Sequence, residues 1–169
     1  MISFTSEIFL LEKLKLKYVE IPAEILIQTK TDSDKTIYNQ RFKIKINDSE
    51  IWQAGVVSLG NNKGYISIKS TILKENHLLL GDEVTVYLEK DESEFGMEVS
   101  EELIEVLAQD SEGNRRFDLL PIGKKRYIIY YVNQVKSSDK KIERALMLIT
   151  NLKKTVIGKE EFRFLLGKE

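Results

Sequence analysis

The clearest hydrophobic pattern lies between Gly64 and Asp91, where a strand leads into a short helix and then a second strand. β-Branched and aromatic residues after Gly64 are typical of a strand. The apolar residues of STILKENHLLL then take helical spacing. Gly81-Asp82 predicts a turn, because glycine accepts positive φ and aspartate stabilises tight turns. Alternation over 84–88 predicts a second strand with one buried face.

An earlier stretch repeats the first half of this pattern at a constant offset. YVEIPAEILI, from Tyr18 to Ile27, aligns with YISIKSTILK, from Tyr65 to Lys74, with five apolar or aromatic matches in ten positions. In the first copy a polar loop at 30–39 leads to the alternating strand RFKIKIN. Two copies predict a duplicated half-barrel and not a solenoid. The alternative is that any two strand-to-helix junctions share such a pattern.

Short strands fill the rest of residues 1–95. Strands are predicted at 2–13 and 16–21, and a turn over 60–64 closes a hairpin. In EIWQAGVVSLG, Trp52 and either Val56 or Val57 are expected to point inward. Six or seven strands at this spacing indicate a β-barrel domain.

Residues 96–169 are expected to form a helical extension packed on the barrel. Ser100 is predicted to cap a helix that is followed by a loop, DSEGN. Further helices are predicted over 124–136 and 139–154, while the final FRFLLG fits either a strand or a docked tail. The buried side of the 139–154 helix is predicted to comprise Ile142, Ala145, Leu146, Ile149 and Leu152.

Several of these segments resemble a bacterial family of unknown biochemistry, the YdeI/OmpD-associated or bacteriocin-protection-like proteins. The likeness is carried by IPAEIL, FKIKIN, GDEVTVYLEKD, VSEELIEVLAQD, FDLLP, RYIIYYVNQVK and DKKIERAL, in the family's order. The strand after Gly-Asp is also similar to the swapped hairpin of AbrB-like transcription factors. The resemblance implies an α+β fold, a double-split (AbrB-like) β-barrel from two pseudo-repeated β-α-β halves followed by helices, and no established activity. The chain departs from the family at Leu73, Ser100, Tyr131, Lys140 and Lys141, where the family usually has Arg, Pro, Trp and a Thr-Arg pair, and it retains Arg144.

The sequence contains few residues or motifs that are typical of catalysis or cofactor binding. There is no cysteine, which excludes disulfides, thiolate nucleophiles and cysteine-based zinc sites. His77 is the single histidine, no motif surrounds it, and a structural or surface position is expected. GNNKG lacks the length and ending of a phosphate-binding loop. We therefore predict no cofactor, no metal and no catalytic residue.

Charge is distributed unevenly although the net charge is −1. Residues 96–114 carry six acidic and no basic side chains, whereas 115–169 carry fourteen Lys or Arg against six Asp or Glu. This surplus of basic residues predicts that the helices of the second stretch carry a basic interaction face for an anionic partner. The alternative is that these cations balance the acidic helix near 98–110. The predicted face comprises Lys125, Arg126, Lys136, Lys140, Arg144 and Lys154.

Together these features predict a non-enzymatic, cytoplasmic binding protein of the YdeI/OmpD-associated type, with no membrane span. Through the resemblance, a link to envelope stress or bacteriocin protection is implied. DNA binding through the basic tail is a second hypothesis, which the sequence pI of 6.0 does not favour. A small-molecule pocket at the seam between barrel and helices is a third.

Overall fold

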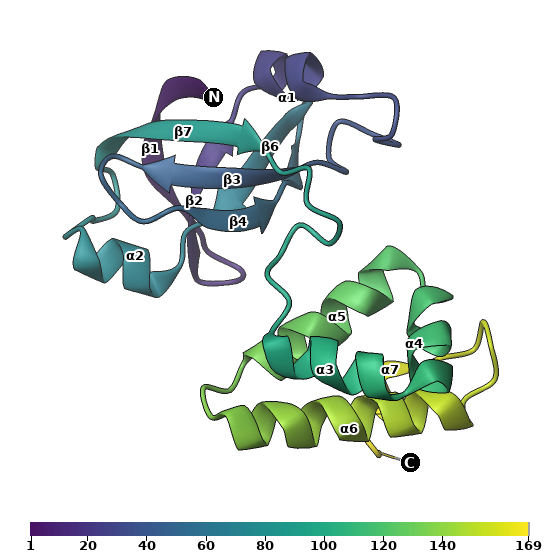
Figure 1. Cartoon of the computed structure of the whole chain (residues 1–169). Helices are drawn as coiled ribbons and strands as arrows, with labels where there is room; N and C mark the ends of the chain where they lie inside the picture. Colours follow the sequence, from purple (N-terminus) through teal and green to yellow (C-terminus); the bar gives the residue numbers. More distant parts are fainter. Residues whose placement is uncertain (169) are drawn as a thin grey trace. The chain divides into compact units, whose positions relative to one another are not determined.

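In the computed structural model, which describes residues 1–168, the chain divides into two compact units, Met1–Gly96 and Met97–Glu169 (Figure 1). The first unit contains seven strands and two short helices, and the second contains five helices. The predicted α+β class is therefore confirmed at this level.

The strands of the first unit form a single antiparallel sheet in the order β4-β3-β7-β1-β2-β6-β5. They are β1 (Ile2–Leu11), β2 (Leu16–Ile21), β3 (Arg41–Ile46), β4 (Trp52–Gly55), β5 (Val57–Gly60), β6 (Lys63–Ser67) and β7 (Glu83–Lys90). The first six residues of β1, from Ile2 to Glu7, pair with β7, and its last four pair with β2. Because one strand serves both parts of the sheet and β4 also contacts β6, the sheet curls into a half-barrel.

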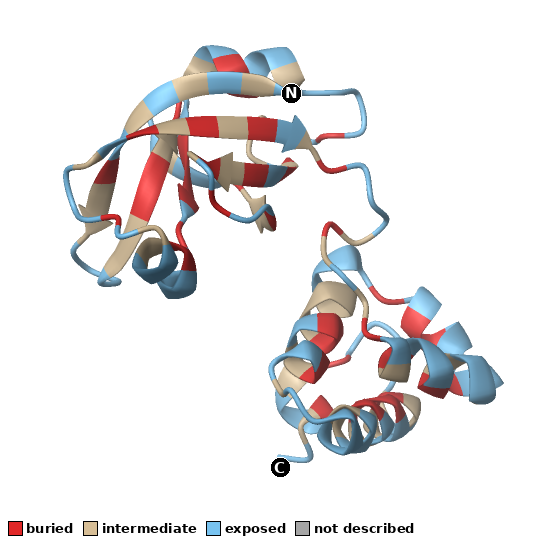
Figure 2. Cartoon of the chain, turned by 60° about the vertical axis from the view of Figure 1, so that its left-hand side comes forward, coloured by how far each residue is buried: buried red, intermediate tan, exposed pale blue. Residues whose placement is uncertain are grey.

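The concave side of the sheet is the core of the first unit. Phe42, Ile44 and Ile46 are fully buried while their neighbours along β3 are not, as the alternation predicts. β7 buries every second residue in the same way (Figure 2). Trp52 and Val56 are buried and Val57 is exposed, so Val56 is the inward residue of the two predicted.

Each of two strands leads directly into a short helix. α1 (Ala23–Thr29) follows β2, and α2 (Ser70–Glu75) follows β6. Pro22 precedes α1, where its missing N–H costs nothing. Ser70 and Thr71 do not cap α2, because the helix already begins at Ser70. Lys69 is at the N-cap and makes no side-chain capping bond.

The second unit contains α3 (Glu101–Gln109), α4 (Ser111–Asp118), α5 (Ile122–Asn133), α6 (Ser138–Lys154) and α7 (Phe162–Leu165). The DSEGN segment is the start of α4 and not a loop. Asp110 explains this difference, because its carboxylate accepts a hydrogen bond from the Gly113 N–H at 2.8 Å and so caps a new helix. FRFLLG contains the short helix α7, whose Leu165 is buried and accepts a hydrogen bond from the Asn151 side chain.

α6 is the centre of the helical unit and contacts α3, α4, α5 and α7. Its buried residues are Ala145, Leu148, Ile149 and Leu152. Ile142 and Leu146 were expected on this buried side, but they are 39% and 51% exposed. They lie one turn apart on the edge of the apolar stripe, so the neighbouring helices cover the centre of that stripe and leave this edge open.

Candidate functional site

The six cations of the predicted basic face lie on α5, on the loop after it and on α6. Lys136, Lys140 and Lys154 are exposed, whereas Lys125 and Arg126 are half-buried. The Lys125 ammonium lies 5.6 Å from the centre of the Phe117 ring. Lys140 and Lys154 are separated by about 21 Å along α6, at 1.5 Å per residue. The positive charges are therefore spread along the helices and do not gather at one point.

Arg144 is engaged within the helical unit. Its guanidinium lies 4.3 Å from the centre of the Tyr131 ring and donates a 2.7 Å hydrogen bond to the Tyr131 carbonyl oxygen. Such a stack over an aromatic ring holds the end of an arginine in place. Arg144 thus joins α6 to α5.

A groove of about 850 Å³ runs between α3 and α6 and ends at the start of α4. Its size is within the range of sites that bind ligands. The residues that line it are Glu101, Glu102, Glu105, Val106, Gln109, Asp110, Ser111, Glu112, Ser138, Ile142 and Leu146.

The rim of the groove is acidic. Five carboxylates line it, and no Lys or Arg does. Glu102 is 3.5 Å from Lys141, Asp110 pairs with Lys153, and Glu112 pairs with Arg115. Within residues 1–168, Glu101 and Glu105 have no ion pair with Lys or Arg. Negative charge on the rim therefore exceeds what the neighbouring cations neutralise.

Three of these carboxylates are held in the charged form. Hydrogen bonds from its own backbone N–H and from Ser138, with the charge of Lys141, lower the pKa of Glu102. The Lys153 ammonium and then the Gly113 N–H lower the pKa of Asp110, and Arg115 lowers that of Glu112. All three are ionised at neutral pH, because their ordinary pKa values are already near 4.

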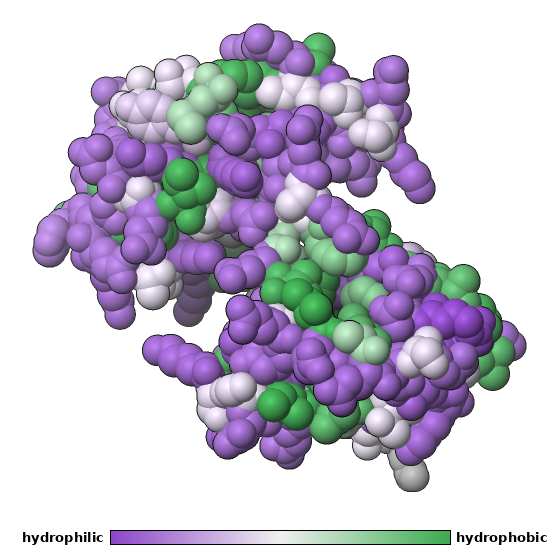
Figure 3. All heavy atoms as spheres, in the orientation of Figure 1, coloured by the Kyte–Doolittle hydropathy of each residue, from purple (hydrophilic) through white to green (hydrophobic). Residues whose placement is uncertain are grey.

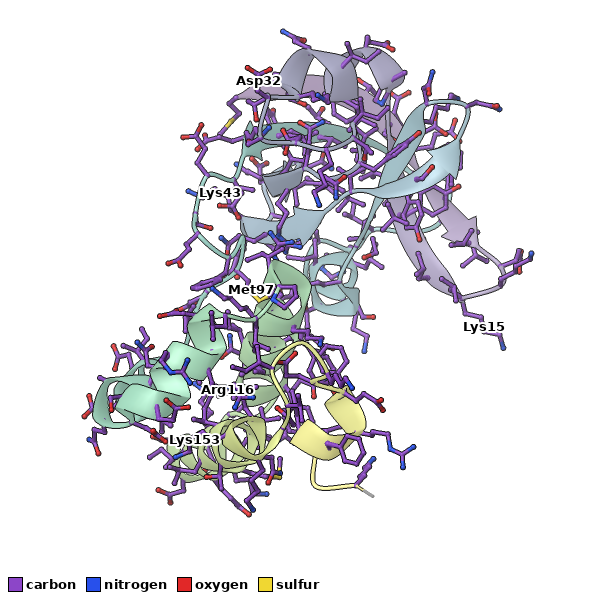
Figure 4. All side chains as sticks on the ribbon, turned by 90° about the vertical axis from the view of Figure 1, so that its right-hand side faces the viewer. Lys15, Asp32, Lys43, Met97, Arg116 and Lys153 are labelled. Atoms are coloured by element: carbon purple, nitrogen blue, oxygen red, sulfur yellow. The ribbon has the colours of Figure 1, made fainter. Side chains whose placement is uncertain are left out.

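The floor of the groove is apolar. Val106 is buried beneath it, while Ile142 and Leu146 present open apolar surface from α6. Figure 3 shows apolar side chains of the helical unit as green areas among the hydrophilic surface. Lys153 on α6 and Arg116 on α4, both labelled in Figure 4, link these two helices. Arg116 donates to the carbonyl oxygens of Lys153 and Thr155.

Sequence reasoning missed this groove, because Ile142 and Leu146 were assigned to the core. One signal was present. The apolar stripe of α6, with Leu148 included, is wider than one neighbouring helix can cover, and the first helix of the unit, α3, carries acidic side chains and no basic ones. Those two facts together indicate an apolar edge beside negative charge.

His77 lies in the turn after α2 and is exposed. This position agrees with the surface placement expected from the sequence. In the part of the chain that the structure describes, no three His, Asp or Glu side chains are arranged to hold a metal ion. None of the helices described has the length and apolar character needed to span a bilayer.

Comparison with known proteins identifies the second unit. No curated protein sequence matches the chain. Residues 96–155 match the sequence model of a family described as "Bacteriocin-protection, YdeI or OmpD-Associated". This stretch runs from the end of the first unit through α6 and contains every residue that lines the groove. In this region, the chain is therefore similar to the YdeI/OmpD-associated family.

Proposed function

We propose that this chain is a non-enzymatic binding protein that acts in the cytoplasm, and that its helical unit binds a cationic, amphipathic helical segment of a protein or peptide. The groove between α3 and α6 is the binding site. The absence of cysteine in 169 residues is consistent with a reducing compartment. The family description names bacteriocin protection, and binding of a cationic peptide is one way in which such protection could operate.

The combination of an apolar floor with an acidic rim is the observation that carries this proposal. An amphipathic helix binds a groove through apolar residues on one face, spaced at three and four positions. Ile142 and Leu146 offer the apolar surface that such residues need. Glu101 and Glu105, one turn apart on α3, are placed to meet Lys or Arg on the flanks of the bound helix.

The experiment uses a fluorescently labelled, twenty-residue Leu/Lys amphipathic helix and measures anisotropy on addition of the full chain. Reversing two rim charges, Glu101→Lys with Glu105→Lys, is expected to weaken binding about tenfold or more, since each removed attraction is replaced by repulsion. Leu146→Ser is expected to weaken it by a similar factor through loss of apolar contact. Raising the salt concentration should weaken wild-type binding as well.

The matched control is Asp118→Lys with Glu143→Lys, which makes the same charge change at exposed positions outside the groove. If this control weakens binding as much as the rim variant, the groove is not the site. Duplex DNA serves as the competing probe. Salt-dependent DNA binding that is lost when Lys136, Lys140 and Lys154 are changed to Gln would favour a DNA-binding regulator instead.

For the first unit we propose a double-split, AbrB-like barrel whose two β-α-β halves are related by an approximate twofold axis. Val19 pairs with Ile66, and these are equivalent positions in the two copies. Lys45 pairs with Tyr87, which are equivalent when β3 is aligned with β7 on their buried residues. A twofold axis through both pairs would exchange the halves. Two compact halves within one chain also leave the helical unit free to serve as the binding part.

A further inference from the structure

The half-barrel unit has a hollow of its own, of about 680 Å³, between the turn that joins β1 to β2 and the helix α2. We propose that this hollow, here called the hairpin pocket, binds a small amphipathic anion. The ligand would have one carboxylate or phosphate head and an apolar body. This inference concerns the first unit only and does not depend on the groove of the helical unit.

The hairpin pocket carries uncompensated positive charge. Lys15, Lys17 and Lys74 line the hairpin pocket together with His77, and no Asp or Glu lines it. None of the three lysines forms an ion pair within residues 1–168. Three other lysines of the unit, Lys45, Lys63 and Lys90, do form ion pairs, as Lys63 does with Glu20 at 2.7 Å. Three like charges around one hollow raise its potential and attract an anion.

An apolar wall lies between these cations. Ile68 and Leu78 are buried at the base of the pocket, and Leu16 and Leu73 are half-buried. Leu79 is 66% exposed beside them. A bare phosphate would leave this surface in contact with water, whereas a ligand with an apolar body covers it. The wall therefore favours an amphipathic anion over an inorganic one.

Two residues that line the pocket have an unusual backbone conformation. Five non-glycine residues have positive φ among those described, and three of them are asparagines, which tolerate this conformation well. The other two, Lys15 and His77, both line the hairpin pocket. Figure 4 shows Lys15 at the tip of its hairpin. A lysine in the left-handed region is unusual, and such residues gather at functional sites.

Under the proposed duplication, the hairpin pocket has an equivalent place in the other half of the unit. Lys17 and Leu73 of the pocket correspond to Gly64 and Leu26 in the other half. There the space is filled, because a Cβ on Gly64 would lie 2.4 Å from Val56 and 3.0 Å from Leu26. The space between strand and helix is thus filled in one half. In the other half it is open and lined by lysines.

The test is isothermal titration calorimetry of the full chain with dodecanoate, kept below the concentration at which it forms micelles. One saturable site is expected. Changing Lys15, Lys17 and Lys74 to Gln should weaken binding about tenfold or more, since each exposed charge contributes a modest share. Ser70→Phe, at an exposed lining position, keeps all three charges and should weaken dodecanoate binding by filling the pocket.

Three comparisons make the result decisive. Lys30, Lys35 and Lys43 changed to Gln form the charge-matched control, and this variant should bind as wild type does. Inorganic phosphate should compete only weakly with dodecanoate for the wild-type pocket. Dodecyl phosphate should bind as dodecanoate does, if the pocket recognises the shared chemistry of charged head and apolar body. Affinity for vesicles of anionic phospholipid, without any saturable binding of either monomer, would overturn the proposal, as would equal losses in the pocket and control variants.

Discussion

The groove of the helical unit and the hairpin pocket of the half-barrel unit are opposite in charge but alike in construction. Each combines an apolar surface with several ions of one sign. The half-barrel unit carries twelve Lys and Arg against fifteen Asp and Glu, yet its pocket is basic. The helical unit carries fourteen against twelve, yet its groove is acidic. The sign of a local surface therefore does not follow from the net charge of the unit that carries it.

The two surfaces also differ in what forms them. The groove lies along two helices, so its shape depends on how α6 packs against α3 and α4. The hairpin pocket lies between one turn and one short helix, both held by the sheet. Changes in helix packing should therefore affect the groove much more than comparable changes affect the pocket.

The largest effect is expected from cavities in the two cores. Leu148→Ala removes a fully buried side chain from α6 and should lower the free energy of unfolding of the helical unit by about 2–5 kcal/mol. Leu88→Ala should do the same to the half-barrel unit. Far-UV circular dichroism reports chiefly on the helices, and fluorescence of the single tryptophan, Trp52, reports on the half-barrel. Each variant should shift one signal much more than the other during denaturation; equal shifts in both would contradict the view of two separate cores.

A smaller effect on stability is expected from a substitution in the first turn of α4, beside the groove. A Cβ at Gly113 would lie 2.4 Å from the Ile149 side chain and 2.8 Å from the Asp110 carboxyl carbon. Gly113→Ala should therefore destabilise the helical unit by about 1–3 kcal/mol and weaken cationic-peptide binding, because Asp110 is displaced.

Gly123 provides the matched control for that substitution. It lies in α5, and a Cβ there would meet no atom within 4 Å. Gly123→Ala should stabilise the unit by about 0.4–1 kcal/mol, since alanine has less freedom to lose on folding. Denaturation curves of the two variants should move in opposite directions; movement in the same direction would show that contacts around Gly113 are not the cause.

Two members of the basic face, Arg144 and Lys140, are expected to differ in how much they contribute to stability. Arg144→Gln should lower the free energy of unfolding by about 1 kcal/mol, because the stack on Tyr131 is lost. Lys140→Gln, at an exposed position on the same helix, should change it by less than about 0.5 kcal/mol. Similar values for both variants, measured by denaturant titration, would mean that the contact with Tyr131 contributes nothing.

The smallest effect concerns pH. The pKa of Asp110 is lowered by Lys153 and by the Gly113 N–H, so the folded state binds this proton less readily than the unfolded chain. Stability from the ionised carboxylate is fully present above the ordinary pKa of about 3.9 and is lost as the pH falls through the lower, folded value. Asp110→Asn should lower the thermal midpoint of the helical unit by a few degrees at neutral pH. This difference should shrink in acid; a difference that stays constant down to the lowest pH would refute the role of the charge.

Much of the strand structure could be predicted because its signal is local. Alternation over Phe42, Ile44 and Ile46 identifies the buried face of β3 without knowledge of any neighbour. The helices around α4 were harder, because Asp110 both ends one helix and caps the next. A polar, glycine-containing segment such as DSEGN is typical of a loop, and only the capping bond shows that a helix begins there.

The candidate sites were predicted least well. The basic face was assigned from charge alone, whereas Lys141 and Lys153, which were not among its six members, are the cations that pair with the acidic helix. An apolar stripe on a helix shows which residues avoid water, but it does not show where the neighbouring helices stop. Ile142 and Leu146 are exposed because the neighbouring helices do not extend over them.

The sequence alone determined the α+β composition, the alternating core of the sheet and the likeness to the YdeI/OmpD-associated family, because each depends on the order of neighbouring residues. Only the tertiary structure decided which apolar and charged side chains share a surface. Glu101 and Leu146, or Lys15 and Lys74, are far apart along the chain, and packing of separate elements brings them to one hollow. Binding surfaces of this kind are set by long-range contacts, and local periodicity carries no information about such contacts.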